Sequence, residues 1–128
     1  MTAWMSEELS KIGAAEELEI ASLRDDGTLR NPVTIWVVRY GDDLYVRSVN
    51  GRTSSWFRGA QDRQEGRIWA GGVEKEVTFV DAGDDIADQL DAAYRAKYRR
   101  YAASINGTVV SPQARSATLK LVPRSTSA

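Results

Sequence analysis

The sequence predicts an α+β protein that is mainly β, a six-stranded antiparallel barrel with peripheral helices. Two observations support this prediction: turn signals join the short apolar stretches as hairpins, and the helical stretches lie outside them. Short antiparallel strands with helices outside the run usually close into a small barrel. The alternative is a cystatin-like sheet curved around a helix. That fold needs its long helix before most of its strands, whereas here the helix follows five of them.

The expected strands follow from residue type and alternation. Polar and apolar residues alternate in the first strand, and β-branched and aromatic residues after Pro32 predict a central strand. Gly41-Asp42-Asp43 and Gly71-Gly72 are the turns of two hairpins. The six strands are expected at residues 19–23, 33–38, 44–49, 66–70, 73–80 and 117–122.

Helices are expected between and around these strands. Ser6 is the expected N-cap of an N-terminal helix, because acidic residues fill the turn that follows it. Residues 54–64 have helical spacing, with Phe57 and Ala60 on one side. The longest helix is expected from residue 84 to about residue 101, where basic residues suit its C-terminal end. Ser111-Pro112 begins a short turn or helix.

The length of 128 residues predicts a single domain over 1–128, with 1–5 and 124–128 as frayed termini. No apolar run approaches the roughly 20 residues of a membrane helix, and the N-terminus is acidic rather than signal-like. A cytoplasmic protein that does not bind a membrane is therefore expected.

The chain contains no histidine and no cysteine. Serine triads, cysteine nucleophiles, zinc sites and haem ligation through these side chains are therefore excluded, and no metal site is expected. Any general acid or base must be Asp, Glu, Tyr, Lys or water. Such a chain is better suited to binding, or to redox chemistry supplied by a cofactor, than to unaided hydrolysis.

The net charge is −1, but the charges lie in blocks, with basic excess over residues 29–69 and 94–128. A nucleic-acid-binding protein is usually basic overall, so the near-neutral total argues against such a partner. Local basic clusters fit a small anionic ligand better. A helix C-terminus followed by a solvated tail explains the last block equally well.

The densest polar cluster follows the expected strand 44–49. Its arginines, hydroxyls and tryptophan surround Asn50-Gly51 and lead into the next helix. Helix N-terminal amides, hydroxyls and guanidinium groups together can bind a phosphate. Alternatively the stretch is a plain turn, with Ser54 or Ser55 as N-cap and solvated arginines. The candidate phosphate-binding residues are Arg47, Ser48, Arg52, Ser54, Ser55 and Arg58, with Trp56 beside them.

Four segments carry a family resemblance: "PVTIWVVRYGDDLYVRS", "GRTSSWFR", "RIWAGGVEKEVTF" and "DAAYRAKYRRY". Together they resemble a bacterial, largely actinobacterial family, domain-of-unknown-function family 2255, from about Glu7 to Arg124. That family is similar to the split β-barrels of pyridoxamine 5′-phosphate oxidase and the deazaflavin-dependent nitroreductases. The resemblance implies a six-stranded split β-barrel and a homodimer with its cofactor site between subunits. It also implies FMN or a deazaflavin held by the residues of the polar cluster, with Trp56 flanking the ring or ribityl chain.

A second candidate site lies in "YRAKYRRY", where Tyr94 and Tyr98 share one helix face with Tyr101. Their hydroxyls could line a substrate pocket together with Trp36, and could bind or protonate the oxygens of a substrate. Packing of the rings on the barrel is the alternative. Glu74 and Glu76 share a strand face and are either a carboxylate pair or two exposed acids.

Two classes of function follow. One is an oxidoreductase that uses FMN or a deazaflavin and transfers a hydride to or from a small organic substrate. The other is a cofactor-free barrel that binds a small anionic or aromatic molecule, with a biosynthetic cyclase or isomerase as one form of this class. In either case the protein is expected to bind a small molecule.

Overall fold

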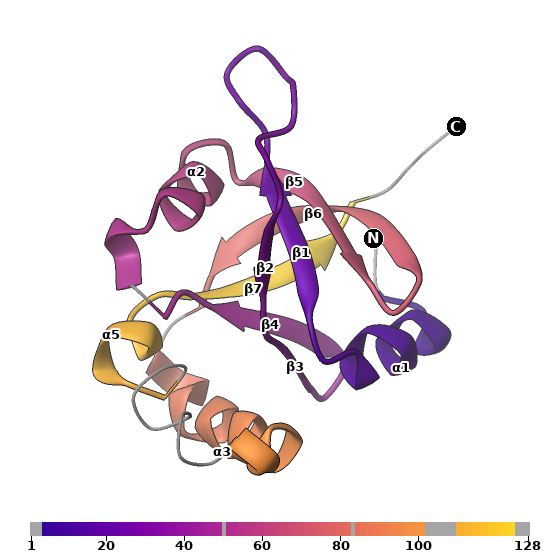
Figure 1. Cartoon of the computed structure of the whole chain (residues 1–128), viewed down its shortest axis with the longest axis vertical. Helices are drawn as coiled ribbons and strands as arrows, with labels where there is room; N and C mark the ends of the chain where they lie inside the picture. Colours follow the sequence, from indigo (N-terminus) through magenta and orange to yellow (C-terminus); the bar gives the residue numbers. More distant parts are fainter. Residues whose placement is uncertain (1–3, 50, 83, 102–109, 125–128) are drawn as a thin grey trace.

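The computed structural model describes residues 4–49, 51–82, 84–101 and 110–124. These residues form one antiparallel sheet of seven strands, in the order β2-β1-β5-β6-β7-β4-β3, which curls into a nearly closed barrel (Figure 1). The strands are β1 (Leu18–Ser22), β2 (Val33–Ile35), β3 (Val37–Tyr40), β4 (Asp43–Arg47), β5 (Glu65–Ala70), β6 (Val73–Asp81) and β7 (Thr118–Pro123).

The expected central strand 33–38 is wrong, and its division accounts for the seventh strand. β2 pairs with β1, whereas β3 pairs with β4, so the two halves form opposite edges of the sheet. Only Trp36 separates them. Its ring stacks on Tyr98 with centroids 4.0 Å apart and planes within 4°. A continuous β-branched run thus brings the two edges of the sheet together, which nearly closes the barrel.

The two expected hairpins are confirmed. β3 and β4 are joined through Gly41-Asp42, and β5 and β6 through Gly71-Gly72. Glycine is needed at these turns because Gly41, Gly71 and Gly72 have φ of +64°, +57° and +83°, the left-handed region that other residues rarely adopt.

Six helical segments surround the barrel among the described residues when the single-turn segment η2 (Asp84–Ile86) is left out. α1 begins one residue earlier than expected, since Met5 rather than Ser6 is the N-cap and its amide donates to Glu8. The expected long helix is divided, because α3 ends at Lys97 and η3 follows after Tyr98. The segments are α1 (Ser6–Ala14), α2 (Ser55–Arg63), α3 (Ala87–Lys97), η3 (Arg99–Tyr101) and α5 (Pro112–Arg115), with η1 (Gly51–Thr53) ahead of α2.

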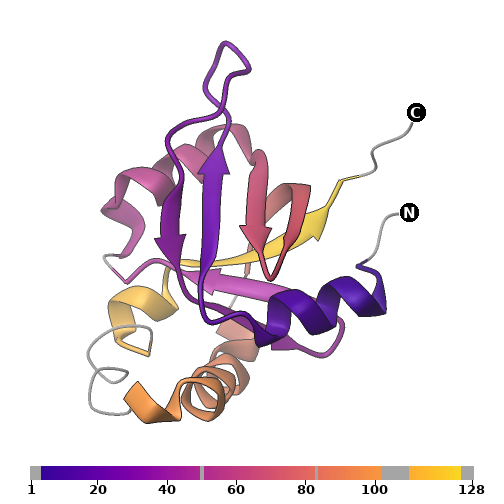
Figure 2. The same ribbon diagram turned by 45° about the vertical axis from the view of Figure 1, so that its right-hand side comes forward.

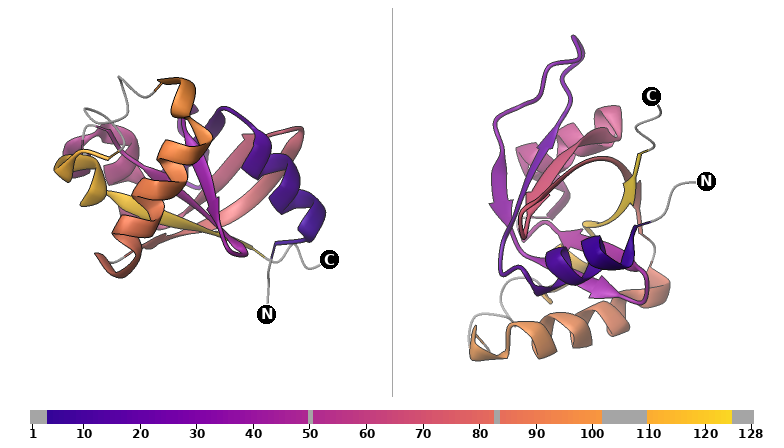
Figure 3. Two further views of the ribbon diagram at one scale, coloured as in Figure 1. Left: turned by 90° about the horizontal axis from the view of Figure 1, so that it is seen from below. Right: turned by 90° about the vertical axis from the view of Figure 1, so that its right-hand side faces the viewer.

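The interior of the barrel is filled by side chains from every long strand and from α1 and α2. Ile12, Leu18, Phe57 and Ile68 are among its fully buried members. α2 packs against β1, β5 and β6, α1 packs against β3, β4 and β6, and α3 lies across β3 at the end of the barrel (Figure 3). No helix among the described residues is long and apolar enough to cross a bilayer.

The tyrosine face of α3 belongs to a second core cluster. Tyr94 and Tyr98 are buried against Val38 and Tyr45, and Trp36 packs on them from the edge of the barrel. The Tyr98 hydroxyl donates to the carbonyl of Glu16 at 2.6 Å. Burial raises the pKa of both tyrosines above the ordinary value. These rings hold α3 on the barrel.

Arg47 is buried at the end of β4, with 1% of its surface exposed. Its Nη1 donates to the carboxylate of Asp91 on α3. Its Nη2 donates to the Ala87 carbonyl at 3.1 Å, and its Nε donates to Thr118 Oγ1 of β7, also at 3.1 Å. Tyr94 covers the guanidinium, whose central carbon is 5.5 Å from the centre of the ring. The side chain thus joins β4, β7 and α3.

Lys97 reaches from the end of α3 back to the barrel. Its Nζ donates to the Val37 carbonyl at 2.6 Å and lies 5.1 Å from the centre of the Tyr98 ring. Burial lowers the pKa of Lys97 to about 8, although the nearby Glu16 carboxylate acts in the opposite direction.

We predict that Arg47→Met lowers the free energy of unfolding by about 3 kcal/mol, because the buried Asp91 carboxylate then keeps only its longer contact with Arg115, at 3.6 Å. Chemical denaturation followed by circular dichroism measures this. The double variant Arg47→Met/Asp91→Leu should recover part of the loss, since both charges are then gone. As control, Arg67→Ala removes an exposed ion pair to Glu74 and should cost at most about 1 kcal/mol. Equal effects of the two single variants would contradict the structural role of Arg47.

A second prediction concerns alkaline pH. Between pH 8 and about 10.4, the ordinary lysine pKa, the unfolded chain holds a proton at Lys97 that the folded protein has lost. As the pH rises through this window, the contribution of Lys97 therefore increases the free energy of unfolding of the parent protein, the unsubstituted chain. In Lys97→Met this contribution is absent, so the difference in unfolding free energy between variant and parent should change in favour of the parent from pH 8 to pH 10. A difference that is constant with pH would contradict the lowered pKa.

Candidate functional site

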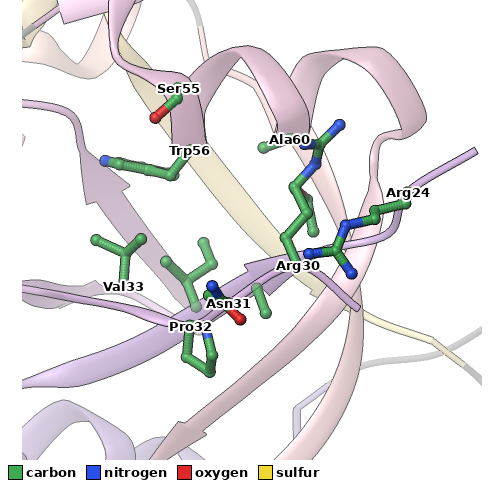
Figure 4. Close-up of a pocket in the computed structure, with 11 residues that line it drawn as sticks. Arg24, Arg30, Asn31, Pro32, Val33, Ser55, Trp56 and Ala60 are labelled. Atoms are coloured by element: carbon green, nitrogen blue, oxygen red, sulfur yellow. The ribbon is translucent and has the colours of Figure 1, made fainter. Parts of the chain in front are cut away.

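A cavity of about 320 Å³ lies between β1, β2, the connection 23–32 and α2. The connection projects beyond the barrel beside α2 (Figure 2). One wall is α2, and the other is the end of β1 with the start of β2 (Figure 4). The lining residues are Ile20, Ala21, Ser22, Arg24, Arg30, Asn31, Pro32, Val33, Ser55, Trp56 and Ala60.

The connection is fixed by its own hydrogen bonds. The Asp26 carboxylate accepts from the amide and hydroxyl of Thr28 at 3.0 and 2.7 Å, and these bonds lower the pKa of Asp26. The Arg30 amide donates to the Ser22 carbonyl at 2.9 Å, which extends the pairing beyond β1. From α2, Arg63 Nη1 donates to the Arg24 carbonyl at 2.7 Å. The cavity therefore has a defined wall on the side of the connection.

The two ends of the cavity differ in chemistry. Arg24 and Arg30 lie at one end, while Trp56 lies at the other end above Val33 and Pro32 (Figure 4). No acidic side chain lines the cavity among the described residues. An aromatic and aliphatic end next to a cationic end suits a ligand that joins a flat ring to an anionic group.

The guanidinium groups at the cationic end have few competing partners. Arg24 Nη1 donates to the Leu29 carbonyl at 2.9 Å and to the Thr28 hydroxyl at 3.4 Å, both neutral acceptors. Within the described part of the chain, the Arg30 guanidinium has no hydrogen bond or ion pair. Arg30 can therefore accept an anionic partner without breaking an existing contact.

The structure separates the seven residues of the expected phosphate site. Ser55 and Trp56 line the cavity, Ser55 as the first residue of α2. Arg58 lies on α2 and is exposed. Arg47 does not reach the surface, because the ion pair with Asp91 holds its guanidinium inside the protein.

The remaining three residues hold the turn between β4 and α2. The hydroxyls of Ser48 and Ser54 hydrogen bond to each other at 2.9 Å, and Ser54 is the N-cap of α2 without a side-chain capping bond. Arg52 pairs with Asp81 at 2.8 Å and donates to the Ser116 carbonyl at 2.6 Å. These contacts tie the turn to the end of β6 and to the start of β7.

The turn itself requires glycine at residue 51. Gly51 has φ of +77°, and a Cβ atom there would lie 2.4 Å from the Gln113 side chain. The expectation that the chain turns here is therefore confirmed at Gly51, while Asn50 lies outside the described residues.

Among the polar lining residues, sequence analysis missed Ser22, Arg24, Arg30 and Asn31. In the sequence this segment was only the connection between the strands expected at 19–23 and 33–38. The pair of arginines near its two ends was the available signal, because a hairpin places both ends of its connection close together.

The expected substrate-pocket residues lie elsewhere. Trp36, Tyr94 and Tyr98 form the second core cluster, and none of them lines the cavity beside α2. Tyr98 does border a separate hollow of about 280 Å³ together with Lys97, Arg99, Ala14 and Glu16. Glu74 and Glu76 both pair with Arg67, at 3.0 and 3.8 Å, so they form an ion-pair cluster on the surface of the sheet.

Solved structures share this fold. An F420 reductase matches with a TM-score of 0.57 and 14% identity over 93% of both chains. An FAD-binding protein from Mesorhizobium loti matches with a TM-score of 0.58 and 14% identity, over 96% of this chain and 92% of that one. A protein of unknown function from Agrobacterium tumefaciens gives a TM-score of 0.62 at 10% identity, over 97% of this chain and 56% of its own.

At these identities the likeness shows the fold alone, a barrel found in proteins named for flavin and deazaflavin cofactors. No curated protein matched the chain. A family model does match, over residues 8–121, and its description is "Uncharacterized protein conserved in bacteria (DUF2255)". The resemblance seen in the sequence is thereby confirmed, and the chain belongs to the DUF2255 family of bacterial proteins.

Proposed function

We propose that the protein binds FMN or a deazaflavin in the cavity beside α2 and transfers a hydride to or from a small organic substrate. The observation that carries this proposal is the two-ended cavity, with Trp56 at its aromatic end and Arg24 and Arg30 at its cationic end. Flavin-type cofactors join a flat ring system to a phosphate through a polar chain. The shared fold with proteins named as F420 reductase and FAD-binding protein supports the same assignment.

The residues present fit such a group. Ser22 lines the cavity, and its hydroxyl is buried and has no hydrogen-bond partner among the described residues. Two guanidinium groups without a lining acid suit a phosphate. The volume of about 320 Å³ lies at the lower end of the roughly 300–1,000 Å³ of ligand pockets, so part of the cofactor would extend beyond this cavity.

The side chains of the cavity would bind and orient the cofactor. Trp56 would pack against the ring, Ser55 would hydrogen bond to the polar chain, and the arginines would neutralise the phosphate. The cofactor, when bound, supplies the hydride chemistry. The lining contains no carboxylate, tyrosine or lysine among the described residues, so the cavity walls offer no side chain suited to proton transfer near neutral pH.

That last observation also bears on the second candidate, a cofactor-free barrel. A cyclase or isomerase without a cofactor needs an acid or base at its substrate. The composition of this cavity favours simple binding of an anionic aromatic molecule over such catalysis.

A homodimer belongs to the same proposal. The cavity covers only part of a flavin, and a second copy of the chain would cover the rest. Light scattering should give about twice the chain mass of 14.2 kDa, and a monomer would count against the dimer.

We predict that FMN or a deazaflavin binds with quenching of its fluorescence, and that Trp56→Leu and Arg30→Ala each weaken this binding. One charge-assisted contact is worth about 1.5–3 kcal/mol, so Arg30→Ala should weaken it roughly ten- to a hundredfold. Fluorescence titration of the purified variants measures both effects.

Matched controls are available in the same chain. Trp69 is also half-buried but lies outside the cavity lining, and Arg58 is exposed on α2 outside it. Trp69→Leu and Arg58→Ala should bind as the parent does. If neither cofactor binds to the parent, the redox proposal is wrong. If the control variants weaken binding as much as the cavity variants, the site is wrong.

A further inference from the structure

The hollow of about 280 Å³ lies where the end of α3 meets the connection between α1 and β1. It is lined by Ala14, Glu16, Lys97, Tyr98 and Arg99, none of which lines the cavity beside α2. Its volume is close to the roughly 300 Å³ of the smallest ligand pockets, so only a small molecule fits here.

Lys97 differs from the other lysines of the chain in its partners. Lys11, Lys75 and Lys120 each pair with a carboxylate, at 2.8, 3.1 and 3.7 Å. Lys97 has no ion pair among the described residues, and its Nζ donates to a neutral acceptor, the Val37 carbonyl, at 2.6 Å. This amine is therefore half-buried without a carboxylate bonded to it.

These surroundings favour the neutral form of the amine. The pKa of Lys97 falls to about 8, because burial outweighs the opposite effect of the Glu16 carboxylate. That carboxylate is exposed and accepts a hydrogen bond from the Tyr101 hydroxyl at 2.8 Å. A desolvated lysine amine that has lost its proton is a nucleophile, whereas an ammonium group has no free electron pair.

The same hollow offers a cationic group for an anion. Arg99 begins η3 two residues after Lys97, and it is exposed. Its guanidinium has no hydrogen bond or ion pair within the part of the chain that the structure describes. Guanidinium groups bind carboxylates through two parallel hydrogen bonds. A molecule with an electrophilic carbon and one carboxylate therefore has a partner for each in this hollow.

We infer that the hollow is a site for a small aldehyde that carries one carboxylate, with Lys97 as the nucleophile and Arg99 as the partner of the carboxylate. The amine nitrogen adds to the aldehyde carbon, and both amine hydrogens leave with the carbonyl oxygen as water, which gives an imine. A proton from solvent then gives the protonated imine. Its one N–H can still donate to the Val37 carbonyl, and its charge stays near the Tyr98 ring, whose centre lies 5.1 Å from Nζ. This covalent binding site goes beyond the proposed function and does not depend on it.

Reductive trapping tests the site in the purified protein. The protein is incubated at pH 8 with glyoxylate and cyanoborohydride, which reduces an imine to a stable carboxymethyl-lysine, and peptide mass spectrometry locates the product. Lys97 should be labelled roughly tenfold faster than Lys11, Lys75 or Lys120, because its amine is partly neutral and free of a carboxylate partner. In guanidinium chloride, which unfolds the chain, the four lysines should react alike. Equal labelling in the folded protein would overturn the inference.

The role of the carboxylate is tested with an aldehyde that lacks one. The rate of labelling at Lys97 should saturate with glyoxylate but rise linearly with propionaldehyde. Arg99→Ala should slow the reaction with glyoxylate several-fold and leave that with propionaldehyde unchanged, since one exposed ion pair is lost. Arg95→Ala, an exposed arginine of α3 outside the lining, should behave as the parent. A linear dependence on glyoxylate in the parent, or an unchanged rate in Arg99→Ala, would show that no such site exists.

The result is separable from that of the proposed function. No flavin or deazaflavin is present during labelling, and Arg30→Ala and Trp56→Leu in the cavity beside α2 should leave the labelling of Lys97 unchanged. Selective, saturable labelling would support the site whether or not FMN binds to the protein. Its absence would overturn the site even where FMN binds.

Discussion

The ion pair between Arg47 and Asp91 joins α3 to the barrel, beside the buried rings of Tyr94 and Tyr98. Burying two charges is costly unless their hydrogen-bonding groups are satisfied, and all three guanidinium nitrogens of Arg47 are bonded. The pair joins β4 to α3, and Thr118 extends it to β7. Because the guanidinium of Arg47 is buried and bonded inside the protein, it is not available to a ligand.

The cavity beside α2 is the result of a different constraint, the near-closure of the barrel at Trp36. β2 is held to β1 and β3 to β4, so the connection before β2 lies alongside α2. Arg63 then ties that connection to the end of α2. One helix thus packs on the barrel with Phe57 and Ala60 and presents Ser55 and Trp56 to the cavity.

Local signals predicted much of the fold. Gly41-Asp42 and Gly71-Gly72 fixed two hairpins, and the spacing of Phe57 and Ala60 predicted α2, because each signal acts within a few residues. The break at Trp36 could not be predicted from the sequence. A β-branched run shows the same residue pattern whether it forms one strand or is divided into two strands at opposite edges of the sheet. The tyrosine face of α3 was correctly offered as a packing surface.

The candidate site was predictable only in part, for a related reason. Ser55 and Trp56 were chosen from a local cluster and do line the cavity. The partners that decide the roles of Arg47 and Arg52 lie 44 and 29 residues away in the sequence, so pairing could not be inferred from spacing. The same holds for Ser22 and Arg30, which line the cavity with α2 only because β1 and α2 pack together.

Nuclear magnetic resonance of the isotope-labelled protein during FMN titration tests the location of the ligand site most directly. The account predicts that the amide signals of Ser22, Arg30 and Ser55 and the indole signal of Trp56 shift together. Signals of Ser48 and Ser54 at the turn, and of Tyr98 in the second cluster, should stay nearly unchanged. Shifts confined to the turn or to the surroundings of Tyr98 would contradict the assignment of the cavity beside α2 as the binding site.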